Sequence, residues 1–236
     1  MPICYNCGNE FQEENITREH IPAQNLFAGY GDEYKVNRIV VPACFECNNQ
    51  YSQIDQEIRD AIGIMNNNDD KQTELTRKSV KSIMRRKSWA DRLFFNDGKV
   101  LAVDFSYDDL KKLHIKNFKG VFFNKYGRPF PKDFEVEIIA EGDDDNEKLM
   151  GIGKLFFDYV IRDNDFLVSG HEDIFMYNLR TMNPTDTEYV EDNGDIENCL
   201  CVVGVLIYHK NMCSIVIAAK KDFLEGVKKD RDKNLT

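Results

Sequence analysis

The fold is decided by two short stretches near the N-terminus, Cys4-Tyr5-Asn6-Cys7-Gly8 and Pro42-Ala43-Cys44-Phe45-Glu46-Cys47-Asn48. Each contains a C-x2-C pair, and 36 residues separate the two pairs. Two such pairs supply the four thiolates of a structural zinc site. The alternative is four unrelated buried thiols, but the polar run at residues 48–50 is not typical of a core. The spacing therefore predicts bound Zn²⁺ held by Cys4, Cys7, Cys44 and Cys47.

The residues between and after the cysteine pairs predict a hairpin followed by a helix. Residues 17–22 read as a short extended segment, and the β-branched residues 37–42 read as a strand that pairs back on it. From Cys44 onward, apolar residues recur at helical spacing up to residue 62. A cysteine knuckle, a hairpin and a helix in this order predict a treble-clef zinc module.

Three further polar residues lie inside this frame: Glu19, His20 and Asn48. The motifs Cys4-x2-Cys7, Thr17-x-Glu19-His20-Ile21-Pro22, Asn37 and Pro42-x-Cys44-x2-Cys47-Asn48 together resemble the HNH endonuclease family with its ββα-metal motif. The resemblance is to members of the family that carry a structural zinc site and whose motif reads His-Asn-Asn (H-N-N). It covers residues 1–62. It implies metal-dependent hydrolysis of phosphodiester bonds in nucleic acid, with DNA as the expected substrate. By analogy it also suggests a role in restriction or phage defence.

The resemblance implies a role for each matching residue. His20 corresponds to the general base that takes a proton from the attacking water. Glu19 and Asn48 correspond to ligands of one catalytic cation, Mg²⁺ or another divalent ion such as Mn²⁺ or Ni²⁺. Asn37 corresponds to the asparagine that orients the histidine from the facing strand. Glu19 departs from the aspartate that is commoner in the family, which bears on metal preference.

The predicted helix extends this site. Asn48, Ser52, Asp55 and Arg59 share one helical face. Asp55 is therefore a candidate for a further metal ligand or for a residue that holds the metal ligands in place. Arg59 is a candidate for a contact with a phosphate. The alternative is an ordinary Asp55–Arg59 ion pair on a solvated face.

The formal net charge of −10 requires any nucleic-acid binder to concentrate its positive charge locally. Residues 71–92 carry eight basic and two acidic residues, whereas residues 1–62 carry four basic and ten acidic ones. We predict an amphipathic helix over residues 71–95, with Val80, Ile83, Met84, Ala90 and Phe94 facing inward. Its other face offers candidate nucleic-acid contacts at Lys78, Lys81, Arg85, Trp89 and Arg92. The alternative is a basic face that is merely solvated.

The rest of the chain predicts an α+β unit with a mainly antiparallel sheet. Strands are expected at residues 99–105, 134–140, 166–169, 174–179, 200–209 and 213–219. Helices are expected at 148–161 and after Ser106, the latter with Leu110, Leu113, Phe118, Val121 and Phe122 inward. The fold class is therefore α+β, in four parts: an HNH-like zinc module at 1–65, a basic helical linker at 71–97, an accessory domain at 98–220 and a charged tail at 221–236.

The remaining features favour a cytoplasmic protein. No signal-peptide pattern or transmembrane-length apolar run is present in the sequence. We expect buried free thiols at Cys199, Cys201 and Cys213. We expect packing or surface histidines at His114, His171 and His209. We interpret the acidic runs 141–147 and 186–197 as solvated loops. A homodimer or a protein partner would use the C-terminal domain. The alternative function is a non-catalytic zinc module that binds nucleic acid or protein, which would not need Glu19, His20 and Asn48 together.

Overall fold

The computed structural model describes residues 1–65, 73–86, 88, 91–97, 99–104, 106–139, 157–158, 161, 165–182, 196–197, 199–210 and 212–225. Strand β1 (Ile16–Ile21) pairs antiparallel with β2 (Ile39–Cys44), and three short 3-10 turns precede and separate them: Glu13–Asn15, Gln24–Phe27 and Asp32–Lys35. Helices α1 (Phe45–Asn49) and α2 (Ser52–Met65) follow directly. The structure therefore has the predicted order of knuckle, hairpin and helix, with the helix interrupted at residues 50–51.

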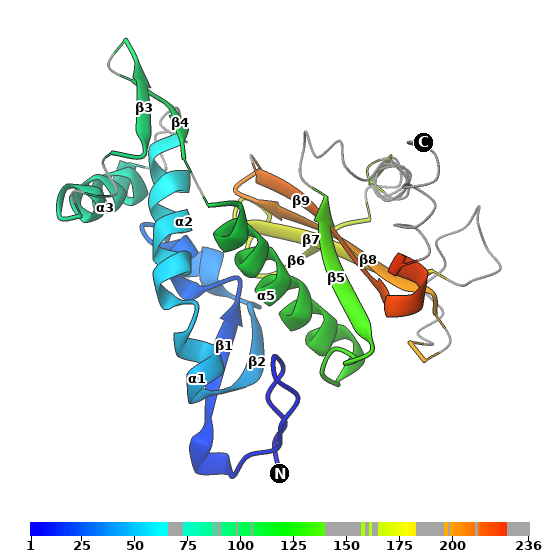
Figure 1. Ribbon diagram of the computed structural model, residues 1–236. Helices are drawn as coiled ribbons and strands as arrows, with labels where there is room; N and C mark the ends of the chain where they lie inside the picture. Colours follow the sequence, from blue (N-terminus) through cyan, green and yellow to red (C-terminus); the bar gives the residue numbers. More distant parts are fainter. Residues whose placement is uncertain are drawn as a thin grey trace, which may run out of the picture.

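The next segment forms an arm that projects from the body (Figure 1). It consists of helix α3 (Thr73–Met84) and a hairpin of β3 (Leu93–Asn96) and β4 (Lys99–Val103). The predicted helix over residues 71–95 is therefore too long. Asn96 pairs with Lys99, and Asp97, which directly follows β3, has a φ of 49°. Asp-Gly is a preferred two-residue hairpin loop, and this local signal outweighs the helical apolar spacing.

The buried face of α3 also differs from the prediction. Ile83 is buried, but Val80 and Met84 are exposed, and Phe94 is exposed on β3. The face that packs on α2 carries the buried residues Leu75, Ser79 and Ile83, and an added Cβ at Gly63 would lie 3.0 Å from the Ser79 Cβ. Because the polar Ser79 stands between Leu75 and Ile83, this face is only partly apolar, and among the described residues the predicted face shares only Ile83 with it.

In the described part of the C-terminal half, helix α5 packs on an antiparallel sheet. Helix α5 (Tyr107–Tyr126) begins after Ser106 and ends at Gly127, whose φ of 67° is the left-handed conformation that glycine adopts easily. The sheet has the order β5-β9-β8-β7-β6 with antiparallel neighbours throughout. Its strands are β5 (Phe134–Ile139), β6 (Leu167–Val168), β7 (Phe175–Met182), β8 (Cys201–Tyr208) and β9 (Met212–Lys220). The predicted α+β class with mainly antiparallel sheets is confirmed.

Helix α5 lies between this sheet and the N-terminal hairpin (Figure 1). The predicted inward residues Leu113, Phe118, Val121 and Phe122 are buried, and Leu110 packs on them. One hydrophobic cluster runs from Ile21 and Val41 on the hairpin, through α5, to the sheet. Residues 1–65 and the C-terminal unit thus share a single core, and groups on α5 lie close to the candidate site.

The remaining single-residue predictions are mostly confirmed. His114 and His209 are buried, and His171 packs on Tyr34 with ring centroids 4.1 Å apart. Cys199 and Cys201 are buried, but Cys213 is exposed, because it lies near the start of β9 beside the turn.

Several predictions fall on residues outside the described ranges. These are most of the helix at 148–161, the acidic run 141–147, most of the acidic run 186–197 and the tail beyond residue 225. Within the described part of the chain, no helix has both the length and the hydropathy that crossing a membrane requires.

Gly120 sets the distance between α5 and β1. A Cβ at this position would lie 2.5 Å from Cδ1 of Ile21, which is fully buried. We expect Gly120→Ala to destabilise the protein by about 1–3 kcal/mol from overpacking, reduced by the gain of about 1 kcal/mol in helix propensity. Urea unfolding measures this change in the free energy of unfolding.

A rescue experiment separates overpacking from a backbone effect. The new Cβ would meet both Cγ1 and Cδ1 of Ile21, and Ile21→Ala removes both atoms, at an expected cost of about 2–5 kcal/mol by itself. If the contact is the cause, the double variant is more stable than the sum of the two single effects predicts. Strict additivity would show that Gly120 acts through something other than Ile21.

Candidate metal and catalytic site

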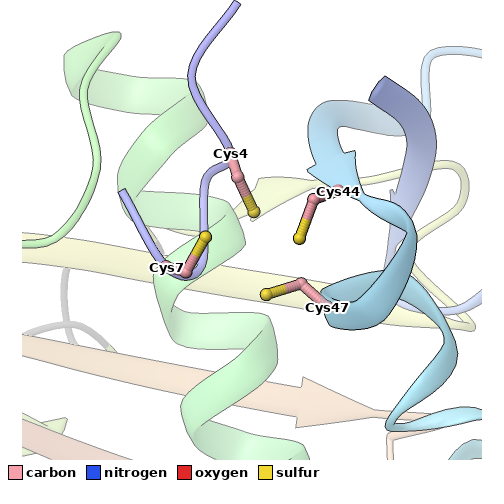
Figure 2. A group of neighbouring side chains, drawn as sticks. All are labelled: Cys4, Cys7, Cys44 and Cys47. Atoms are coloured by element: carbon pink, nitrogen blue, oxygen red, sulfur yellow. The ribbon is translucent and has the colours of Figure 1, made fainter. Parts of the chain in front are cut away.

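Four cysteines from two separate segments converge at the N-terminal end of the molecule. Cys4 and Cys7 lie on one turn, Cys44 ends β2, and Cys47 lies in α1 (Figure 2). Their four Sγ atoms all lie within 4.8 Å of one another. Tetrahedral zinc with Zn–S bonds of about 2.3 Å requires sulfur–sulfur distances of about 3.8 Å, so the four thiols could hold a metal ion such as zinc.

The local backbone explains this convergence. Gly8 has a φ of 73° and donates its N–H to the Cys4 carbonyl at 3.0 Å, which closes the turn that carries Cys4 and Cys7. The Tyr5 N–H donates to the Pro42 carbonyl at 2.8 Å and so ties this turn to β2. Cys44 is the last residue of β2, and α1 begins directly after it. The predicted set of four cysteines is thus brought together by the predicted elements.

A pocket of about 270 Å³ lies beside this cluster, between β1 and the helices. It is lined by Arg18, Glu19, His20, Ala23, Gln24, Asn25, Asn48, Asn49, Ser52 and Asp55. The structure therefore brings together Glu19, His20, Asn48 and Asp55, which the sequence analysis selected. It adds Asn25, whose side-chain oxygen is buried without a hydrogen-bond partner. Asn25 lies in the loop between the strands, where nothing in the sequence marks it.

Asn48 is held in a defined orientation. Its side-chain Nδ2 donates to Thr17 Oγ1 at 2.8 Å, and Thr17 in turn donates to the Ala43 carbonyl at 2.9 Å. Because the amide nitrogen is engaged, the amide oxygen is the Asn48 group that remains for a ligand. Thr17, one residue of the predicted motif, thus positions Asn48 from the neighbouring strand.

His20 is half-buried, and its Nδ1 is buried without a hydrogen-bond partner. Burial lowers the pKa of His20, and the nearby cations Arg38 and Arg18 lower it further. The neutral imidazole is therefore the main form near pH 7, and it carries a lone pair that can accept a proton.

Two predicted site residues lie elsewhere. Asn37 does not line the pocket: it is exposed at a φ of 54° in the turn before β2, and the residue opposite His20 is Val40. The predicted strand start at residue 37 is two residues too early, which removes Asn37 from the facing strand. Arg59 does not line the pocket either, because its Nε donates to Asp60 at 2.8 Å.

The alternative Asp55–Arg59 ion pair is also replaced by another contact. Asp55 pairs with Lys116 of α5, with 2.6 Å between Oδ2 and Nζ. The same Nζ lies 2.9 Å from Glu19 Oε1, and Lys116 is completely buried. Burial by itself would lower the pKa of Lys116, but the charges of Asp55 and Glu19 outweigh it and the pKa is raised. Burial raises the pKa of Glu19 and of Asp55, against the lowering effect of Lys116.

The sequence gives no sign of the role of Lys116. It lies on the side of α5 opposite the centre of the apolar stripe, where a lysine normally indicates solvent. That side of the helix faces β1 and α2 instead, because α5 is covered on two sides (Figure 1).

The candidate nucleic-acid contacts on the arm have different surroundings. Lys81 is exposed on α3 and Arg85 is exposed directly after its end, and Lys78 lies 3.7 Å from Glu74. Arg92 lies 3.6 Å from Glu57 of α2, so part of its charge is compensated within the protein. Trp89 lies outside the described residues.

No protein-family model, curated protein or solved structure matches this chain. The functional assignment therefore depends on the residues of the site.

Proposed function

We propose that this chain is a metal-dependent HNH-type endonuclease that hydrolyses phosphodiester bonds of nucleic acid, with DNA as the expected substrate. One observation carries the proposal: Glu19, His20, Asn48 and Asp55 line a single pocket. A zinc module that serves only as a scaffold has no need for a carboxylate pair, a neutral imidazole and a fixed amide in one concave site.

The donor set of the pocket fits a hard divalent cation. The Asp55 Oδ1 atom is buried without a hydrogen-bond partner, and Asp55 lines the pocket. A buried carboxylate oxygen without a partner is costly, and a cation would satisfy it. Glu19, Asp55 and the Asn48 amide oxygen are all oxygen donors, the type that Mg²⁺ and Mn²⁺ prefer. These three residues would hold the cation.

In the proposed hydrolysis, His20 and Thr17 each have a specific role. His20, in its neutral form, takes the proton from the water that attacks phosphorus. Thr17 keeps the Asn48 amide turned so that its oxygen stays available. A divalent cation in this pocket would supply a Lewis acid that stabilises negative charge on the phosphate and on the leaving oxygen.

The exposed cations of the arm support binding to nucleic acid. Lys81 and Arg85 are exposed on the projecting arm, in a chain that is acidic overall. Contacts of this kind with phosphates weaken as salt concentration rises. On the proposed function, the arm guides the nucleic acid and the pocket cuts it.

Plasmid nicking tests the proposal. Supercoiled DNA is incubated with the wild-type chain in Mg²⁺, Mn²⁺, Ni²⁺ or Zn²⁺, and nicked product is quantified on gels. Loss of a positioned general base typically costs a factor of about 10²–10⁴, so we expect His20→Ala to lose activity by this factor. His171→Ala, which removes a histidine outside the pocket, should cut like wild type.

The outcomes separate the two function classes. Nicking that His20→Ala leaves unchanged would show that the pocket is not the catalytic centre. Wild-type protein that is inactive with every cation, on duplex, branched and single-stranded DNA and on RNA, would favour a non-catalytic zinc module.

A further inference from the structure

Lys116 comes from the C-terminal unit and places a positive charge beside Glu19 and Asp55, two residues that line the pocket. It lies in the middle of α5, and its side chain is completely buried. Its Nζ approaches Asp55 Oδ2 at 2.6 Å and Glu19 Oε1 at 2.9 Å. It also lies 5.4 Å from the centre of the Tyr51 ring, an arrangement that favours a cation.

The ammonium engages one oxygen of each carboxylate. Asp55 Oδ2 is taken by Lys116, whereas Asp55 Oδ1 is buried and has no hydrogen-bond partner. The two oxygens of the Asp55 carboxylate therefore have different surroundings: one accepts from Lys116, and the other is buried without a partner in a residue that lines the pocket. Because Lys116 holds both Glu19 and Asp55, it also fixes the orientation of the two carboxylates relative to each other.

The lysine changes the charge that a cation would meet. Two ionised carboxylates without Lys116 carry −2, and with Lys116 the cluster carries −1. Coulomb repulsion between an ammonium and a divalent cation a few ångströms apart is strong in a site of low dielectric constant. A divalent cation must therefore either displace Lys116 from the carboxylates or bind weakly beside it.

We propose that Lys116 is the resident counter-cation of this site: it positions Glu19 and Asp55 while the pocket is empty of metal and competes with the divalent cation for them. The inference rests on the proposed function, because it concerns the same pocket. It has a consequence for substrate binding. A phosphodiester brings negative charge into the pocket and offsets Lys116, so cation and nucleic acid bind more tightly together than separately.

Mn²⁺ binding to the full-length, zinc-loaded protein tests this without reference to cleavage. Isothermal titration with MnCl₂ is carried out on wild type, Lys116→Gln and Lys116→Arg. We expect Lys116→Gln to bind Mn²⁺ at least tenfold more tightly, because the competing charge is gone. Lys116→Arg keeps the charge and should stay within threefold of wild type. Asp55→Asn should weaken binding and so show that the titration reports this pocket.

Lys112→Gln is a matched control. Lys112 lies one turn earlier on α5 and pairs with Asp109 at 3.3 Å at the surface. This variant changes the net charge by the same amount and should leave Mn²⁺ affinity unchanged. Equal or weaker Mn²⁺ binding by Lys116→Gln would overturn the proposal, as would an equal increase in Lys112→Gln.

Removing Lys116 leaves two buried carboxylates without a counter-charge, so Lys116→Gln can lose its fold in the absence of metal. Thermal unfolding at increasing Mn²⁺ concentrations covers that case. We expect Mn²⁺ to raise the unfolding midpoint of Lys116→Gln more than that of wild type, or to restore a cooperative transition. A variant that stays unfolded at 10-fold more Mn²⁺ than saturates the wild type would contradict the proposal. Failure of plasmid nicking alone would leave this binding result intact and would instead remove the nuclease assignment.

Discussion

Replacing Cys44 by serine should remove the metal from the cysteine cluster and unfold the N-terminal module. Structural zinc sites in small peptides bind with apparent free energies of about 10–16 kcal/mol at pH 7. That is at least as large as the stability of about 5–15 kcal/mol that keeps a whole domain folded. Cys44 ends β2 just before α1, so its loss frees both the hairpin end and the turn that carries Cys4. Zinc content per chain and the urea midpoint measure the effect.

Cys213→Ser is the matched control for this substitution. Cys213 is a free, exposed thiol outside the cluster, and its replacement should leave zinc content and the urea midpoint unchanged. A strong chelator should reproduce the effect of Cys44→Ser on the wild-type protein. One zinc retained per chain in Cys44→Ser, with an unshifted midpoint, would show that the cluster is not a structural metal site.

Acidification should destabilise the protein through His114. Burial lowers the pKa of His114 from 6.5 to about 4. The unfolded chain therefore takes up a proton below about pH 6.5, whereas the folded chain does so only near pH 4. The stabilisation is complete above pH 6.5 and is lost as the pH falls toward 4. Each pKa unit corresponds to about 1.4 kcal/mol, so the loss of unfolding free energy between pH 7 and pH 4 should be about 3 kcal/mol.

The control must remove the titrating group without leaving its partner unsatisfied. His114 Nδ1 lies 3.0 Å from Ser214 Oγ on β9, so His114→Leu is combined with Ser214→Ala. Acid also weakens thiolate–metal bonds, but this affects wild type and double variant alike. The difference in unfolding free energy between them should shrink by about 3 kcal/mol from pH 7 to pH 4. A difference that is constant with pH would show that His114 does not titrate with the expected shift.

Much of the fold could be predicted from local sequence signals. The C-x2-C pairs, the β-branched strand before Cys44 and the alternating apolar strands of the C-terminal sheet each have a short-range signature. These signals yielded the cysteine cluster, the N-terminal hairpin and the β8–β9 hairpin. The same signals placed Glu19, His20 and Asn48 in one site, because a hairpin and the helix after it lie close together in any treble clef.

The errors arose where contacts are distant or lack an apolar signature. The pairing of Lys116 with Asp55 spans 61 residues, and no local pattern indicates it. Asp60 of α2 is fully buried and pairs with Arg59 and with Arg86, which follows the end of α3. Charged residues in a helix normally indicate a solvated face, so no signal in the sequence marks this contact. Burial of ion pairs is decided by tertiary packing, which propensity and periodicity do not contain.

The place of Lys116 in the chain has a consequence for protein synthesis. Glu19 and Asp55 leave the ribosome first, and their counter-cation follows about sixty residues later. Ser169, which donates to the Ile21 carbonyl and accepts the N–H of Ile39, follows later still. A nascent chain that has passed Asp55 but not yet reached Lys116 carries the pocket's acidic groups without the ammonium that pairs with them. The site is therefore completed only after all the residues that line it have been made.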